Sequence, residues 1–207
     1  SGLHIIDEVF TRVKINLLSL PGERLEDIES VEAHLVLLPQ ASAFLEENNI
    51  RGIQAVDSAG AAAALKASKT KGAGVLASKL AAEIYDLKVL AENIEDSDHN
   101  TTRFLLMSSR PDNTRRGDTK MMTTFIFQVR NIPAALYKAM GGFATNGVNM
   151  TKLESYMVGG SFSATQFYAD IEGHPDDNNV KLAMDELSYF TQSISILGVY
   201  PASSKRV

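Results

Sequence analysis

Three polar clusters in the first half of the chain could bind an anion. Asp57-Ser58 and Ser78 directly precede stretches with helical character, and Asn100-Thr101-Thr102-Arg103 leads into an apolar stretch. Free N–H groups at helix N-termini favour anions, and the fork of an arginine guanidinium fits a carboxylate. At the end of a sheet these clusters would suit a small carboxylic acid. In the alternative interpretation, Asp and Ser only cap helices and Arg103 is a solvated surface residue.

Strands that alternate with short helices must position these clusters. The pattern predicts strands within 3–20, near 30–33 and at 53–56 (a short buried strand), 74–77, 89–91 and 102–108, and helices at 39–49, 59–67 and 79–85. Such alternation predicts βαβ units in a doubly wound, largely parallel α/β sheet. Residues 110–120 are polar or turn-forming throughout, which predicts a linker.

The stretch 130–156 predicts a strand exit, a helix and a new strand. Pro133 suits the first turn of this helix, and Asn146-Gly147 suits its end. Its buried face would be formed by Leu136, Ala139, Met140 and Phe143. Gly141-Gly142 inside the helix indicates a close approach of another backbone or of a ligand. A strand over 162–172, a helix over 178–190 and a strand over 193–200 complete a βαββαβ unit of the α+β class.

The composition limits the classes of partner. The 207 residues are 44% hydrophobic, carry a formal net charge of −5 and include no cysteine. The acidic balance argues against a nucleic-acid partner, and no apolar run approaches the ~18 residues of a membrane span. Four histidines without metal-binding spacing predict no metal site. The lack of cysteine fits the cytoplasm, and we expect no signal peptide.

Two sets of motifs resemble the prephenate dehydratase family. Asn100-Thr101-Thr102-Arg103-Phe104 resembles its TRF signature. Pro133 to Leu136 and Glu154-Ser155 resemble the two phenylalanine-binding motifs of the ACT domain that is fused to it. The resemblance covers essentially the whole chain. It implies a prephenate dehydratase-type catalytic lobe over 1–109, a linker over 110–121, a ferredoxin-like ACT domain over 122–201 and a tail over 202–207.

This resemblance implies conversion of prephenate to phenylpyruvate in phenylalanine biosynthesis, without a cofactor and with L-phenylalanine as effector. Thr102 would donate to the leaving hydroxyl and Arg103 would hold a carboxylate. Asn100, Thr101, Phe104, Ser58 and Gln40 would bind substrate. The effector would be bound by Asn131, Pro133, Ala134, Ala135, Leu136, Asn149, Met150, Thr151, Glu154 and Ser155. Pairing of ACT domains implies a homodimer or homotetramer.

The sequence also departs from the family pattern. Ala134 stands where the family usually has Gly, and Tyr156-Met157 where it has Arg-Pro. Ala33 replaces a family Ser, while Arg12 and Lys14 stand where relatives often have Pro and His. The family's first catalytic lobe is not visible. Three interpretations follow: an enzyme, an amino-acid-binding regulatory module with a degenerate lobe, or a fragment whose first lobe is encoded elsewhere in the gene.

Overall fold

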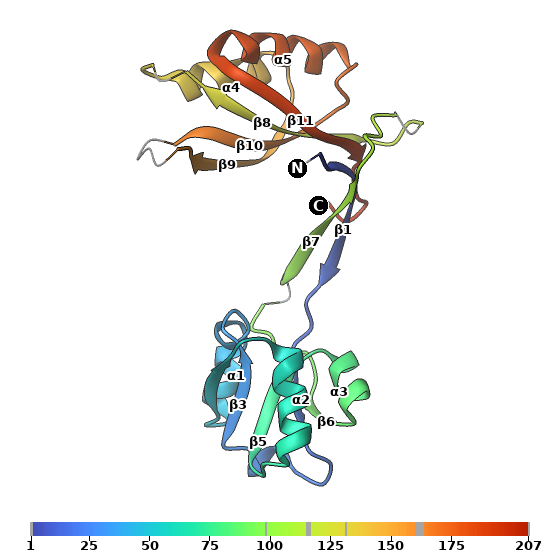
Figure 1. Cartoon of the computed structure of the whole chain (residues 1–207), viewed down its shortest axis with the longest axis vertical. Helices are drawn as coiled ribbons and strands as arrows, with labels where there is room; N and C mark the ends of the chain where they lie inside the picture. The colour runs from blue at the N-terminus through green and yellow to red at the C-terminus, as the bar shows by residue number, and fades with distance from the viewer. Residues whose placement is uncertain (1, 98, 115–116, 131, 160–163, 207) are drawn as a thin grey trace. The chain divides into compact units, whose positions relative to one another are not determined.

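The computed structural model describes residues 2–97, 99–114, 117–130, 132–159 and 164–206, which belong to two compact units (Figure 1). One unit comprises residues 12–102. The other combines residues 1–11 with residues 103–207. The segment 12–102 therefore interrupts the sequence of a unit that both ends of the chain build.

A mixed sheet forms the centre of the unit 12–102. Its strand order is β4-β3-β5-β2-β6, with bounds β2 Asn16–Ser19, β3 Ser30–His34, β4 Arg51–Ala55, β5 Ala73–Ala77 and β6 Lys88–Ala91. β3 runs parallel to β4 and β5, whereas β2 runs antiparallel to β5 and β6. The predicted α/β class is confirmed, but β2 makes the sheet mixed. The prediction that the strand at 53–56 is buried is wrong. β4 lies at the sheet edge, and Val56 after it is 92% exposed.

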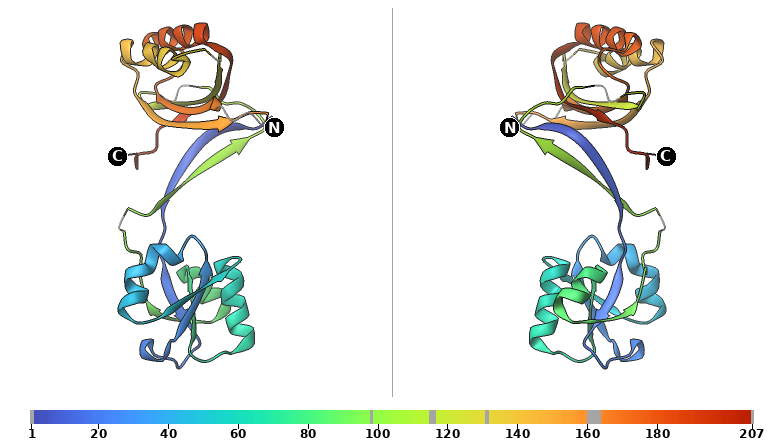
Figure 2. Two further views of the ribbon diagram at one scale, coloured as in Figure 1. Left: turned by 90° about the vertical axis from the view of Figure 1, so that its left-hand side faces the viewer. Right: turned by 90° about the vertical axis from the view of Figure 1, so that its right-hand side faces the viewer.

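Helices cover both faces of this sheet, as Figure 2 shows. They are α1 Ser42–Glu47, α2 Ser58–Ser68 and α3 Lys79–Tyr85, with 3₁₀ turns at Leu25–Asp27 and Leu38–Ala41. Successive strand residues point to opposite faces. Leu17 of β2 therefore packs with Leu45 of α1, and Leu18 packs with Ala62 of α2 and Ala82 of α3. The doubly wound arrangement follows from this alternation.

The second unit contains the predicted βαββαβ order. Its elements are β8 Met121–Val129, α4 Ala135–Thr145, β9 Met150–Met157, β10 Ala164–Glu172, α5 Asn178–Phe190 and β11 Thr191–Pro201. The strands are arranged β11-β8-β10-β9, and β1 His4–Arg12 and β7 Thr101–Ser108 extend the sheet beyond β11. Residues 162 and 163 of the predicted strand 162–172 lie outside the described residues.

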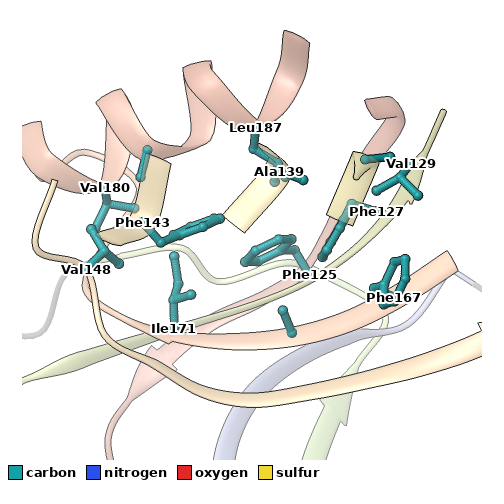
Figure 3. Packing of buried hydrophobic residues seen from close by; sticks show 13 residues of the cluster. Phe125, Phe127, Val129, Ala139, Phe143, Val148, Phe167, Ile171, Val180 and Leu187 are labelled. Atoms are coloured by element: carbon teal, nitrogen blue, oxygen red, sulfur yellow. The ribbon is translucent and has the colours of Figure 1, made fainter. Parts of the chain in front are cut away.

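Both helices of this unit pack on one face of the sheet around a phenylalanine cluster (Figure 3). The ring centroids of Phe125 and Phe143 lie 6.0 Å apart, and those of Phe127 and Phe167 lie 5.3 Å apart. The predicted buried face of α4 is confirmed, with Ala139 fully buried, and Leu187 of α5 is fully buried as well. The predicted close approach at Gly142 is also confirmed, since a Cβ there would lie 2.8 Å from the Cβ of Glu186.

The compact division of the chain differs from the expected boundary at 110–121. β1 pairs in parallel with β11, where Ile5 lies opposite Gly198, and β7 lies beside β1. The sequence predicts the strand 102–108 as part of the first α/β lobe, but from Arg103 onward β7 belongs to the second unit. The reason is that a strand pairs with strands that are distant from it in sequence. Local patterns predict a strand but not its neighbour.

Candidate active site and effector site

Two of the predicted substrate-binding residues meet in the unit 12–102. The Asn100 Nδ2 amide donates to Gln40 Oε1 at 2.7 Å, across 60 positions of sequence. Both side chains are half-buried. They border a hollow of about 350 Å³, whose wall also contains Pro39, Asp96, Ser97 and His99. An amide carries both donors and acceptors, so this pair can bind polar groups of a ligand.

Asp57 and Ser78 act as helix caps, in agreement with the capping interpretation. Asp57 Oδ1 accepts from Gly60 N at 2.6 Å, and Ser78 Oγ accepts from Ala81 N at 3.3 Å. Ser58 Oγ instead accepts from the backbone N–H of His34 at 3.2 Å. Because the Asp57 carboxylate already occupies the N-terminus of α2, the structure supports a cap there rather than an anion site.

Thr102 lies near the start of β7 and is exposed, as is its neighbour Thr101. Phe104, two positions further on, is 55% exposed. The Thr102 hydroxyl is therefore accessible to a ligand, and the ring of Phe104 offers an apolar contact beside it.

Arg103 binds two carboxylates of the protein itself. Its Nε donates to Glu8 Oε2 at 2.7 Å, its Nη1 to Asp170 Oδ2 at 2.5 Å, and its Nη2 to the Tyr200 hydroxyl at 2.6 Å. The side chains of Glu8 and Asp170 are 0% exposed. Arg103 is thus not a solvated surface residue. Its role toward a substrate carboxylate stays a prediction.

A second arginine, Arg206 in the tail after β11, shares these carboxylates. Its Nε lies 2.5 Å from Glu8 Oε1 and its Nη2 lies 2.9 Å from Glu8 Oε2 and 3.5 Å from Asp170 Oδ2. Its Nη1 donates to Thr151 Oγ1 at 3.0 Å. We call Glu8, Arg103, Asp170 and Arg206 the charge cluster.

Burial and pairing act in opposite directions on the charge cluster. Burial is the largest single influence on Glu8 and raises its pKa. Hydrogen bonds from Arg206 and the Ser203 amide, together with both guanidinium charges, outweigh it and leave the pKa below the ordinary value of 4.5. Burial also lowers the pKa of Arg103 and Arg206, but neighbouring groups outweigh it and hold each pKa above its ordinary value. The cluster therefore matches two cations with two carboxylates.

The predicted effector site begins at the N-terminus of α4. Ala134, the N-cap, has φ 60° and ψ 23°, and its side chain makes no capping hydrogen bond. Pro133 lies in the turn before the helix rather than in its first turn as predicted, because the left-handed Ala134 separates it from Ala135. N–H groups of the first turn that have no partner within the helix can bind an anion. Leu136 packs against the core, and Asn131 lies outside the described residues.

The second part of the predicted effector site, 149–155, is mostly exposed. Asn149 borders a hollow of about 360 Å³, whereas Met150 packs against the core. The Glu154 carboxylate accepts from the Tyr156 hydroxyl at 2.8 Å and pairs with Lys152 at 3.0 Å. Ser155 is exposed. Glu154, one of the predicted effector-binding residues, therefore already has two partners.

Sequence reasoning missed the partners of Arg103. Asp170 stands in β10 between Ala169 and Ile171, and Glu8 stands in β1 between Asp7 and Val9. A charged residue between apolar neighbours, such as Asp170, is a signal, because a buried charge needs a partner. That signal does not identify the partner, which comes from a strand far away in sequence.

Within the part of the chain that the structure describes, no group of three or more His, Cys, Asp or Glu residues is arranged to hold a metal ion. The described helices include none that is both long and apolar enough to cross a membrane.

Comparison with protein families gives one model, described as prephenate dehydratase, that matches residues 1–112. A bifunctional N-acyl-homoserine lactone acylase/prephenate dehydratase of Komagataeibacter europaeus is 47% identical over 206 residues, which are 100% of this chain and 73% of that protein. A bifunctional chorismate mutase/prephenate dehydratase of Aquifex aeolicus (strain VF5) is 36% identical over 202 residues, 97% of this chain and 54% of that protein. The chain thus spans about half the length of the second relative.

Two solved structures share the fold over nearly the whole chain. One is described as a novel type of quorum-quenching acylase and is 47% identical, with a TM-score of 0.89. The match covers 100% of this chain and 75% of the acylase chain. The other is a prephenate dehydratase from Arthrobacter aurescens in complex with L-Phe. It is 27% identical, with a TM-score of 0.86, and the match covers 99% of this chain and 68% of the A. aurescens chain.

Proposed function

Because the chain belongs to the prephenate dehydratase family, we propose that it supplies a catalytic lobe and an ACT regulatory domain for the conversion of prephenate to phenylpyruvate. The observation that carries this proposal is the family match over 1–112, a range that contains the accessible Thr102. The reaction would be a step of phenylalanine biosynthesis in the cytoplasm.

The reaction requires the protein mainly to position the substrate, to bind its negative charge and to donate a proton to the leaving hydroxyl. The C–O bond to the leaving hydroxyl breaks as a proton arrives, and the ring carboxylate leaves as carbon dioxide with its bonding electrons passing to the ring. The ring becomes aromatic, so the reaction itself calls for no organic cofactor. Thr102 would donate the hydrogen bond to the leaving hydroxyl. A threonine hydroxyl is a weak acid, so it would act in a site that excludes water.

The amide pair of Gln40 and Asn100 would bind polar groups of the substrate, and Ser58 would add a hydroxyl. Arg103 would attract a substrate carboxylate. Its three observed hydrogen bonds account for three of the five N–H donors of a guanidinium. A substrate carboxylate would therefore bind the remaining donors or replace one present partner.

L-Phenylalanine is the effector that we propose for the βαββαβ domain. Its carboxylate would bind the first turn of α4, whose N-cap side chain makes no capping hydrogen bond. Its ammonium group would exchange for Lys152 at Glu154 and approach Asn149. The L-Phe complex of the related A. aurescens enzyme supports this choice. The exposed side chains of Leu153, Tyr156 and Met157 on the edge strand β9 support pairing into a homodimer or homotetramer.

The test is turnover of prephenate by the purified chain, measured as phenylpyruvate with and without L-phenylalanine. We expect Thr102→Ala to lower turnover by about 10²–10⁴-fold, the usual contribution of one proton donor. Thr70→Ala, which removes another exposed threonine hydroxyl of the same unit, is the control. Near-parental kcat in Thr102→Ala would refute the role of Thr102. A folded chain without turnover that L-phenylalanine still stabilises would instead be a regulatory module.

A second candidate activity is N-acyl-homoserine lactone acylase. The observation that favours it is the 47% identity with the bifunctional K. europaeus protein over all of this chain. The same protein sample, incubated with an N-acyl-homoserine lactone, would release a free fatty acid if this activity is present. An unchanged lactone would remove this candidate.

A further inference from the structure

The charge cluster lies on the face of the six-stranded sheet opposite the phenylalanine cluster. Thr124 and Phe125 are adjacent in β8, and their side chains point to opposite faces. Phe125 packs against the helices, and Thr124 Oγ1 donates to Asp170 Oδ1 at 2.5 Å. No helix supplies a residue of this cluster. Its members come from β1, β7, β10 and the tail that follows β11, beside β1 (Figure 1).

The members of the charge cluster depend on one another. Glu8 and Asp170 are each within ion-pair distance of both Arg103 and Arg206. A buried carboxylate that loses one cation must bind the other more closely, because an unpaired buried charge is costly. A displacement of Arg206 would therefore change how Glu8 and Asp170 hold Arg103.

One end of the cluster reaches the proposed effector segment, and the other reaches the proposed catalytic motif. Thr151, inside the segment 149–155, accepts a hydrogen bond from Arg206 at 3.0 Å. Arg103 is the chain neighbour of Thr102. The path between the two ends consists of side chains whose contacts are all 3.5 Å or shorter.

We propose that Arg206 is a positioning residue that couples occupancy of the effector segment to the Thr102-Arg103 motif through Glu8 and Asp170. The inference rests on the proposed function, since it assigns L-phenylalanine to that segment. A ligand that moves Thr151 alters the Arg206 contact, and the two buried carboxylates pass the change to Arg103. Coupling between sites is reciprocal, and its usual size is about 5–150-fold in affinity.

Two other contacts should keep the tail attached when Arg206 is replaced, so we expect the variant to isolate the coupling. The Ser203 amide donates to Glu8 Oε1 at 3.0 Å, and Lys205 Nζ donates to the Phe10 carbonyl at 3.1 Å. Lys205→Gln is a matched control, because it removes a neighbouring positive charge whose observed contact is a carbonyl rather than the cluster. Arg206→Lys keeps the charge but loses the two-pronged contact with Glu8.

The experiment is hydrogen–deuterium exchange of the β7 amides in the full chain, with and without L-phenylalanine. In the parent chain and in Lys205→Gln we expect the ligand to change β7 exchange severalfold. In Arg206→Gln the ligand should still raise the melting temperature, but the β7 response should fall below twofold, with partial recovery in Arg206→Lys. A full β7 response in Arg206→Gln would overturn the coupling.

A ligand-free comparison separates failure of this inference from failure of the proposed function. If L-phenylalanine neither stabilises the parent chain nor changes its β7 exchange, the effector proposal fails, and the coupling to L-phenylalanine fails with it. The positioning of Arg103 is then judged without ligand. Arg206→Gln should speed β7 exchange at least tenfold more than Lys205→Gln does. Equal exchange in the two variants would overturn the positioning role as well.

Discussion

Replacement of Glu8 by glutamine is the most direct perturbation of the charge cluster. Glu8→Gln keeps the size of the side chain but removes the charge that faces three guanidinium nitrogens at 2.5–2.9 Å. Removal of one partner from a buried ion pair costs about 3–5 kcal/mol. Asp170 still faces both arginines, and the Arg103 and Arg206 side chains are 17% and 18% exposed. We therefore expect the lower end, a loss of about 3 kcal/mol in the free energy of unfolding.

The assay is urea unfolding at neutral pH, followed by circular dichroism. With a urea slope of about 1–3 kcal/mol per molar, the loss moves the midpoint of the affected transition down by about 1–3 M. Glu154→Gln is the control, because it removes an exposed carboxylate on the same sheet, and neither of its two partners is buried. The reasoning is refuted if Glu8→Gln unfolds at the same midpoint as Glu154→Gln.

The pH dependence of this difference follows from the sign of the pKa shift. The folded-state pKa of Glu8 lies below its ordinary value of 4.5. A carboxylate with a lowered pKa stabilises the fold above the unfolded-state pKa, and that contribution is lost as pH falls through the folded-state pKa. We expect the gap between parent and Glu8→Gln to be complete at neutral pH and to shrink below pH 4.5. A gap that grew in acid would contradict the assigned direction.

Three glycine and alanine substitutions test the backbone. Ala134→Gly should stabilise the chain by about 0.5–1 kcal/mol in thermal unfolding, because relief of about 1–2 kcal/mol of left-handed strain exceeds the entropy cost of glycine. Gly198→Ala should speed amide exchange in β1, since its Cβ would overlap the Ile5 carbonyl oxygen and lie 2.6 Å from the Ile5 Cβ. Gly142→Ala should destabilise the chain. Overpacking against Glu186 costs about 1–3 kcal/mol, which outweighs a gain in helix propensity of about 1 kcal/mol. A higher melting temperature of this variant would contradict the expectation.

Local patterns predicted the elements of this chain well. The helix Asn178–Phe190 has the predicted bounds, because its apolar residues recur at helical spacing. The helix Lys79–Tyr85 begins after the predicted cap Ser78. The face of α4 that holds Ala139 and Phe143 was also predictable. Each of these features depends on residues within a few positions of one another.

The charge cluster was beyond such reasoning. Arg103 was recognised as a carboxylate-binding side chain, but Glu8 is 95 positions away from it in sequence and Asp170 is 67. The left-handed conformation of Ala134 was also not predicted, although the family's usual glycine at that position was a signal. In both cases the missing information was which distant strand or turn constrains the residue.

The position of β1 has a consequence for biosynthesis. β1 is synthesised before its partner β11, which follows about 180 residues later and therefore about 10–40 s later at usual rates of synthesis. The unit 12–102 is complete much earlier, and its ends are already joined by a hydrogen bond from Val13 N to the Asn100 carbonyl at 2.8 Å. During translation the unit 12–102 can therefore fold before the unit that flanks it in sequence is complete. β7 can pair with one edge of β1 earlier, but the other edge of β1 stays unpaired until β11 is made. Any delay in translation of residues 191–201 therefore lengthens the exposure of that edge to aggregation.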